Sequence, residues 1–192
     1  MIYETVITTK NEDGTVYIAP MGIRVENDHY VIAPFKPSTT LNNLTRTNQA
    51  VINFTDDVLV FAGCLTRNRD WPITSANVVD GAVLKAALSH CEVEVVRKEE
   101  DELRPVFYCK SLHSETHAPF KGFNRAQAAV VEASILVSRL TMLPSDKIDN
   151  EIEYLKIAID KTAGEKEKKA WGWLMQRIDE YRKEQQSEVL HP

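Results

Sequence analysis

With 192 residues, 43% of them hydrophobic, the chain can form one domain with a full core, or a domain with a small appendage. Its net charge of -5 disfavours nonspecific nucleic-acid binding, and its three cysteines, Cys64, Cys91 and Cys109, are too far apart for a disulfide framework or a four-thiolate zinc site. There is no apolar signal region at the N-terminus and no apolar stretch long enough to span a bilayer, so we expect a soluble cytoplasmic protein with no membrane or nucleic-acid partner.

Up to about Leu112 the chain has the alternation and the β-branched content of β-strands. Turns at Asp13-Gly14 and Asn27-Asp28 separate the first strands, and the charged run KEEDE makes a later hairpin tip. The predicted strands are 2–9, 15–25, 29–34, 50–54, 91–97 and 104–111. An apolar face also predicts one helix over residues 80–89. The pattern indicates an antiparallel barrel, closed or partly closed.

The second predicted strand, residues 15–25, contains a glycine and a proline that bear on ligand binding. Gly22 removes a side chain where a planar ring could lie against backbone amides and carbonyls. Pro20 cannot donate a ladder hydrogen bond, which predicts a sheet edge or a bulge near Met21. A bulge without any ligand explains this strand equally well.

A short helix is predicted to begin near Ser38 and to end at about Thr47. Pro37 disfavours helical geometry at Lys36, and Ser38 is well suited to cap the helix. The first-turn amides have no acceptor within the helix and carry partial positive charge, so a phosphate is a natural ligand there. Taken alone, such a segment is more often a capped surface helix beside a solvated lysine.

From Asn124 onward the apolar period is near 3.6, which predicts helices. Three apolar stripes, each explained by burial, are Ala126/Ala129/Val130/Ala133/Leu136/Val137/Leu140, Ile148/Ile152/Leu155/Ile159 and Trp171/Leu174/Ile178/Tyr181. We therefore expect an α+β chain with a barrel domain over 1–122, a three-helix subdomain over 123–186 and a frayed tail over 187–192.

A strand open to a planar ring, followed by a helix start suited to a phosphate, is the outline of an FMN site. The chain resembles the flavin-reductase-like branch of the FMN-binding split barrels in the segments VITTKNEDG, APMGIR, PFKPSTTLNNL and VINFTDD. It is most similar to an uncharacterised prokaryotic group within that branch, which also shows a segment like FKGFNRAQAAVVEASILVSRL. Thr40 stands where pyridoxamine-phosphate oxidases have a lysine, so vitamin B6 oxidation is not implied.

The resemblance implies an antiparallel split barrel that binds FMN as a homodimer, with the flavin near the subunit interface. The candidate electron donors are a nicotinamide, which can pass hydride directly to the flavin, and a less usual donor such as a deazaflavin. The residues expected to contact the ring or the phosphate are Met21, Gly22, Ile23 and Arg24, and those expected around the phosphate are Lys36, Ser38, Thr39, Thr40 and Asn43.

Two further candidates lie outside these segments. Trp71, in RNRDWPITS, could stack on the flavin across a dimer interface, although an aromatic residue in such a loop more often simply packs. If Asn124 caps the next helix, Arg125 lies in its first turn, where a shared anion such as the flavin phosphate would offset the unfavourable helix dipole. A salt bridge to Glu132 or simple solvation is the commoner alternative for Arg125.

No catalytic motif is present, and a metal site is disfavoured. Cys109, His113 and His117 are spaced by four and would share a face only on a helix, whereas Cys109 falls in a predicted strand. The leading hypothesis is an FMN-dependent oxidoreductase acting by hydride transfer at the flavin. The alternatives are a flavin storage, carrier or sensor module, and a structural protein with an empty barrel whose helical tail recruits a partner.

Overall fold

The computed structural model describes residues 1–190 and divides the chain into two compact units. The first unit comprises residues 1–56 and 70–120, and the second comprises residues 57–69 and the chain from Lys121 onward. Residues 57–69 therefore pack with the C-terminal helices, whereas the sequence pattern had assigned them to the barrel. The tail expected to fray over 187–192 is helical as far as Leu190, and residues 191–192 lie outside the described part.

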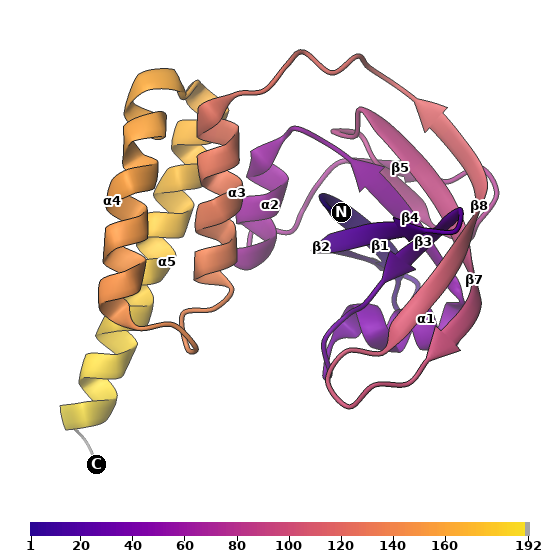
Figure 1. The fold of residues 1–192 in the computed structure, drawn as a ribbon, viewed down its shortest axis with the longest axis horizontal. Coiled ribbons are helices and arrows are strands. Elements are labelled where there is room, and N and C mark those ends of the chain that lie inside the picture. Colours follow the sequence, from indigo (N-terminus) through magenta and orange to yellow (C-terminus); the bar gives the residue numbers. More distant parts are fainter. Residues whose placement is uncertain (191–192) are drawn as a thin grey trace. The chain divides into compact units, whose positions relative to one another are not determined.

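The first unit is a closed antiparallel barrel of six strands in the order β1-β2-β3-β8-β7-β4 (Figure 1). The strands are β1 (Ile2–Lys10), β2 (Val16–Glu26), β3 (His29–Ile32), β4 (Gln49–Phe54), β7 (Ser89–Glu99) and β8 (Val106–Thr116). Pairing of β1 with β4 closes the barrel. All six strands were predicted, and the antiparallel split barrel with a C-terminal helical extension is confirmed.

The helix predicted over residues 80–89 is wrong. Its apolar residues form β6 (Ala82–Leu84), which pairs with β5 (Ile73–Ser75) in a separate two-stranded sheet. Long-range hydrogen bonds fix this segment as a strand, because Leu84 N–H donates to Asn53 Oδ1 at 2.9 Å and Thr8 Oγ1 donates to the Ala82 carbonyl. Tertiary contacts thus override the local helical pattern.

The core of the barrel is closed on one side by α1 (Thr39–Thr47). Leu41 and Leu44 of this helix pack among the buried residues Ile7, Ile23, Ile32, Ala50, Ile52, Cys91, Val93, Phe107 and Cys109. Because Leu44 is wholly buried, the position of α1 is set by the core and not by the surface.

The second unit consists of four helices: α2 (Val58–Leu65), α3 (Arg125–Val137), α4 (Ser145–Thr162) and α5 (Glu165–Leu190). The last three agree with the predicted stripes, whose residues Ala129, Ala133, Ile148 and Leu174 meet in one core. The short helix α2 joins that core through Val58 and Ala62 and was not predicted. No helix in the described chain is both long and apolar enough to cross a membrane.

Replacing Asn124 by alanine should destabilise the helical unit. Asn124 Oδ1 accepts the N–H groups of Ala126 at 2.8 Å and Gln127 at 3.2 Å, and its Nδ2 donates to the Thr162 carbonyl at 3.2 Å. We expect the free energy of unfolding to fall by about 1 kcal/mol or slightly more, measured by urea unfolding followed by circular dichroism. Asn150→Ala, on an exposed face of α4, is the control, and an equal loss there would remove the capping explanation.

Candidate functional site

The start of α1 is capped by Ser38, as predicted. Ser38 has extended backbone angles and its Oγ accepts the Leu41 N–H at 3.3 Å, while the Ser38 carbonyl accepts the Asn42 N–H at 3.1 Å. The amides of Thr39 and Thr40 precede these and have no acceptor within the helix. Two N–H groups at the positive end of the helix dipole therefore point out of the N-terminus of α1, where an anion could accept hydrogen bonds from them.

Asn43 holds α1 against β1. Its Nδ2 donates to Thr9 Oγ1 at 3.0 Å and to Asn11 Oδ1 at 2.9 Å, and its side chain is buried together with that of Thr40. The amide of Asn43, predicted to lie beside the phosphate, is thus already engaged by the barrel. Its contacts make it a positioning residue for α1.

Lys36 is held by the hairpin between β7 and β8. Its Nζ donates to the Asp101 carbonyl at 2.7 Å and lies 3.8 Å from Glu100 Oε2, and its backbone N–H donates to the Leu103 carbonyl. The Asp101 carboxylate accepts the N–H groups of Arg104 and Leu103, which lowers its pKa below the ordinary value. These contacts fix the backbone just before Ser38. They also mean that the Lys36 ammonium, predicted to lie beside the phosphate, already has partners within the protein.

Strand β2 contacts α1, and its neighbour β3 pairs with only part of it. It pairs with β1 from Val16 to Arg24, but with β3 only over Ile23–Glu26. The edge from Ile18 to Gly22 therefore has no ladder partner in β3, which agrees with the sheet edge predicted from Pro20. Pairing with β1 is continuous through Met21, so the strand contains no bulge at this point.

The side chains of the predicted ring-contact residues point in different directions. Ile23 is wholly buried in the barrel core, and Met21 packs against the same core. Arg24 Nε donates to Glu26 Oε1 at 2.7 Å in a partly exposed pair. A Cβ at Gly22 would lie 2.9 Å from Ile2 Cγ2, so the neighbouring strand occupies the space that the glycine leaves. Contact from Gly22 and Ile23 would therefore come through the backbone.

Trp71 carries an unsatisfied donor. Its indole Nε1 is buried and has no hydrogen-bond partner among the described residues. Trp71 precedes β5, which Figure 1 shows well away from α1. Its stacking on a flavin across a dimer interface stays a prediction.

Asn124 and Arg125 belong to the helical unit. Asn124 is the N-cap of α3, as predicted, and its side chain is used in that role. Arg125 is exposed, and among the side chains described through residue 187 it has no ion-pair partner, including Glu132. A role for Arg125 in anion binding stays a prediction.

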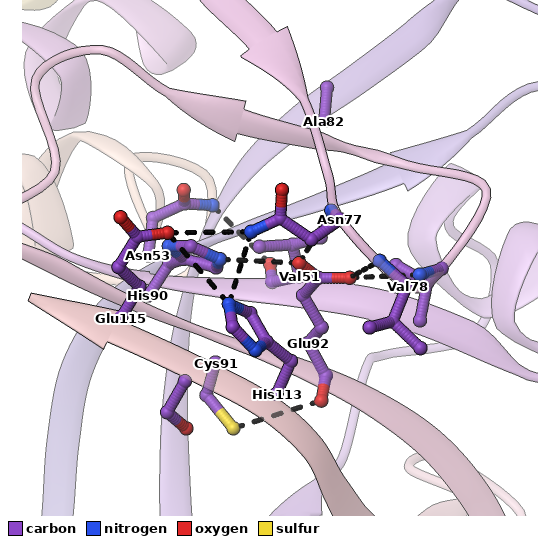
Figure 2. Close-up of polar contacts among 12 residues, drawn as sticks. Val51, Asn53, Asn77, Val78, Ala82, His90, Cys91, Glu92, His113 and Glu115 are labelled. Atoms are coloured by element: carbon purple, nitrogen blue, oxygen red, sulfur yellow. Dashed lines mark hydrogen bonds and ion pairs between the residues drawn. The ribbon is translucent and has the colours of Figure 1, made fainter.

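A polar cluster on β7 and β8 was missed from the sequence. The buried Glu92 carboxylate accepts the N–H groups of Asn77, Val78 and Val79 at 2.6–2.8 Å, and His90, His113 and Glu115 lie beside it (Figure 2). Burial alone would raise the pKa of Glu92, but the N–H donors of Val79, Asn77 and Val78 lower it below the ordinary value.

The set Cys109, His113 and His117, considered from its spacing, is not brought together. Cys109 lies in the barrel core, where burial and then the neighbouring Cys91 raise the pKa of its thiol to about 12. A signal for the actual cluster was present, since residues 113, 115 and 117 share one face if the strand continues past 111.

The chain matches the models of both parts of one protein family. Residues 3–118 match the N-terminal domain of the protein family of unknown function DUF447, and residues 124–176 match a second model of DUF447. The chain belongs to the DUF447 family. This agrees with the predicted resemblance to an uncharacterised group within the flavin-reductase-like split barrels.

Solved structures show the same fold. An FMN-bound DUF447 protein from Methanosarcina mazei is 21% identical, with a TM-score of 0.79 over 92% of this chain and 94% of that one. A 2-nitrobenzoate 2-nitroreductase from Pseudomonas fluorescens is 17% identical, with a TM-score of 0.52 over 59% of this chain and 64% of that one. The flavin reductase of a styrene monooxygenase from Pseudomonas putida is 13% identical, with a TM-score of 0.51 over 60% and 80%. No curated protein matches this DUF447 chain.

Proposed function

We propose that this DUF447 protein binds FMN, with the phosphate at the N-terminus of α1 and the ring along the edge of β2, and acts as a flavin-dependent oxidoreductase. The observation that carries the proposal is the likeness to an FMN-bound protein of the same family over 92% of the chain. Two features of this chain fit the cofactor. The first-turn amides of α1 have no acceptor within the helix and suit an anion, and the β2 edge over Ile18–Gly22 has no ladder partner in β3 and suits a planar ring with donors and acceptors.

Binding of the FMN phosphate, as proposed, depends on the fixed position of α1. The amides of Thr39 and Thr40 donate to phosphate oxygens, and the Ser38 hydroxyl is kept in place by its bond to Leu41 N–H. The burial of Leu44 in the barrel stops the helix from moving away, as do the bonds of Asn43 to Thr9 of β1 and to Asn11 just after it. A prearranged set of donors binds more tightly than a flexible one, because less ordering is needed on binding.

Binding of the flavin ring, as proposed, depends mainly on backbone groups and little on side chains. Backbone groups of the β2 edge near Gly22 hold the polar rim of the ring, and no protein acid or base is required beside it. When bound, FMN supplies the redox chemistry, while the protein holds the ring and leaves one face open to a partner molecule. The electron donor we propose is a nicotinamide or a deazaflavin, and the proposed assembly is a homodimer with the flavin near its interface.

Thr39→Pro tests the phosphate position. Residue 39 is the first residue of α1 and follows an extended Ser38, so proline suits this position. The change removes the amide donor together with the exposed threonine side chain. A hydrogen bond to a charged group contributes about 1.5–3 kcal/mol, so we expect FMN affinity to fall roughly 10- to 100-fold. Fluorescence titration with FMN and with riboflavin gives both dissociation constants.

The matched control is Thr39→Ala, which removes the exposed side chain and keeps the amide. It should leave FMN affinity nearly unchanged. Riboflavin lacks the phosphate, so its affinity should be the same in all three proteins. Equal weakening of FMN and riboflavin by Thr39→Pro would contradict a phosphate at this helix.

Turnover is tested separately from binding. We expect anaerobic NADH or NADPH, or a reduced deazaflavin, to bleach the absorbance of the FMN-loaded protein. An FMN complex that no such donor bleaches would favour the storage, carrier or sensor alternative over an oxidoreductase.

A further inference from the structure

The register of β7 and β8 brings four ionisable side chains to one face of the sheet. His90 pairs with Glu115, and Glu92 pairs with His113. Residues two apart on a strand point to the same side, and directly opposed residues have Cβ atoms about 4.5–5.5 Å apart. The two strands thus present His-x-Glu against His-x-Glu in opposite directions.

The potential ligand atoms of this face converge. One atom from each of His90, His113 and Glu115 lies within 4.8 Å of the other two (Figure 2). Asn77 Nδ2 stands among them, 3.0 Å from His113 Nε2 and 3.3 Å from Glu115 Oε2. An amide nitrogen can only donate, so His113 Nε2 is the acceptor, and its lone pair faces the same point as the carboxylate.

The buried side of the cluster is rigid and its outer side is open. His90 and Glu92 are wholly buried, and Glu92 is held by three backbone N–H groups. His90 Nε2 lies 3.4 Å from Glu92 Oε1, and His90 Nδ1 lies 2.8 Å from His117 Nε2, which together set the plane of the His90 ring. The side chains of His113 and Glu115 are 34% and 50% exposed.

We propose that His90, His113 and Glu115 bind a divalent transition-metal ion of the Zn²⁺ type. Two imidazole nitrogens and one carboxylate oxygen form a donor set that suits Zn²⁺ and similar ions, with an open position for water. Zinc bonds of about 2.0–2.2 Å require the three ligand atoms to close on the ion. The partly exposed His113 side chain and the exposed Glu115 side chain have room to do so, and Asn77, the present donor to both, turns away.

Contacts that orient the metal-binding side chains are already present. His117 beside His90 Nδ1 fixes the imidazole that the ion would bind, and Glu92 anchors the loop that carries Asn77. Such outer contacts typically change metal affinity 10- to 100-fold. The site lies on the outer face of β7 and β8, and its occupancy does not depend on FMN.

Zinc titration of the chelator-treated, full-length protein tests this site. We expect one Zn²⁺ per chain by calorimetry, and visible absorption bands when Co²⁺ is used in its place. His113→Ala, at a partly exposed position, and Glu115→Gln, at an exposed one, should each weaken Zn²⁺ binding at least about 100-fold. Loss of a contact that only orients a ligand would weaken it less. His29→Ala is the matched control, since His29 lies on β3 and contacts the Asn27 carbonyl.

Three results would overturn the proposal. They are no Zn²⁺ or Co²⁺ uptake by the wild-type chain, uptake that survives both His113→Ala and Glu115→Gln, and uptake that His29→Ala reduces equally. Circular dichroism of each variant checks that it is folded. A metal-dependent rise in Tm of the wild-type protein, absent from His113→Ala, provides a second readout that does not rely on calorimetry.

Discussion

Glu92→Gln is expected to lower the free energy of unfolding by about 3 kcal/mol, because a buried, hydrogen-bonded carboxylate is replaced by a group that mismatches its donors. The carboxylate accepts three N–H groups, from Asn77, Val78 and Val79. In glutamine, one oxygen becomes an NH₂ that faces a backbone N–H. The loop over residues 77–79 would lose its anchor, and the measurement is chemical unfolding at neutral pH.

The same variant should lose acid sensitivity. Because the pKa of Glu92 is lowered in the folded state, its stabilisation is present above the unfolded pKa and is lost as pH falls towards the folded one. Stability measured from neutral pH downward should therefore fall more steeply for wild type than for Glu92→Gln. The control is Glu94→Gln, which breaks only an exposed pair with Lys110. Equal losses in the two variants would show that the three N–H bonds contribute little.

Leu44→Ala should lower both stability and FMN affinity. The side chain is wholly buried between α1 and the barrel, so its truncation leaves a cavity that costs about 3 kcal/mol. A helix held less firmly is binding-competent for a smaller fraction of the time, so FMN affinity should fall roughly tenfold. Denaturant unfolding and FMN titration measure the two effects.

Leu174→Ala separates the loss of stability from the loss of FMN affinity. Leu174 is equally buried, but it lies in the core of the helical unit. We expect a similar loss of stability, about 3 kcal/mol, with FMN affinity unchanged. If Leu174→Ala weakened FMN binding as much as Leu44→Ala, the phosphate would not depend on α1 in particular.

The strands of the barrel could be predicted because one-face burial leaves an alternating pattern. The alternating pattern gave no correct prediction for segments that are buried on all sides or whose structure is set by distant hydrogen bonds. Val83 and Leu84 read as a helix face but form a strand held by Asn53. Residues 58–65 are apolar all round, so they show no amphipathic period that would predict α2.

The candidate site could be predicted in its local part only. The cap at Ser38 follows from residues adjacent in sequence, and so does the cap at Asn124. The partners of Lys36 and Asn43 come from segments far along the chain, so no local pattern indicates them. The histidine cluster was missed because β8 extends to Thr116, five residues past its predicted end.

A crystal structure of the protein grown with FMN tests the central proposal most directly. We predict phosphate oxygens within hydrogen-bond distance of the Thr39 and Thr40 amides, with the ring along the β2 edge near Gly22. Density for FMN elsewhere on the chain, with the start of α1 in contact only with solvent, would contradict the account.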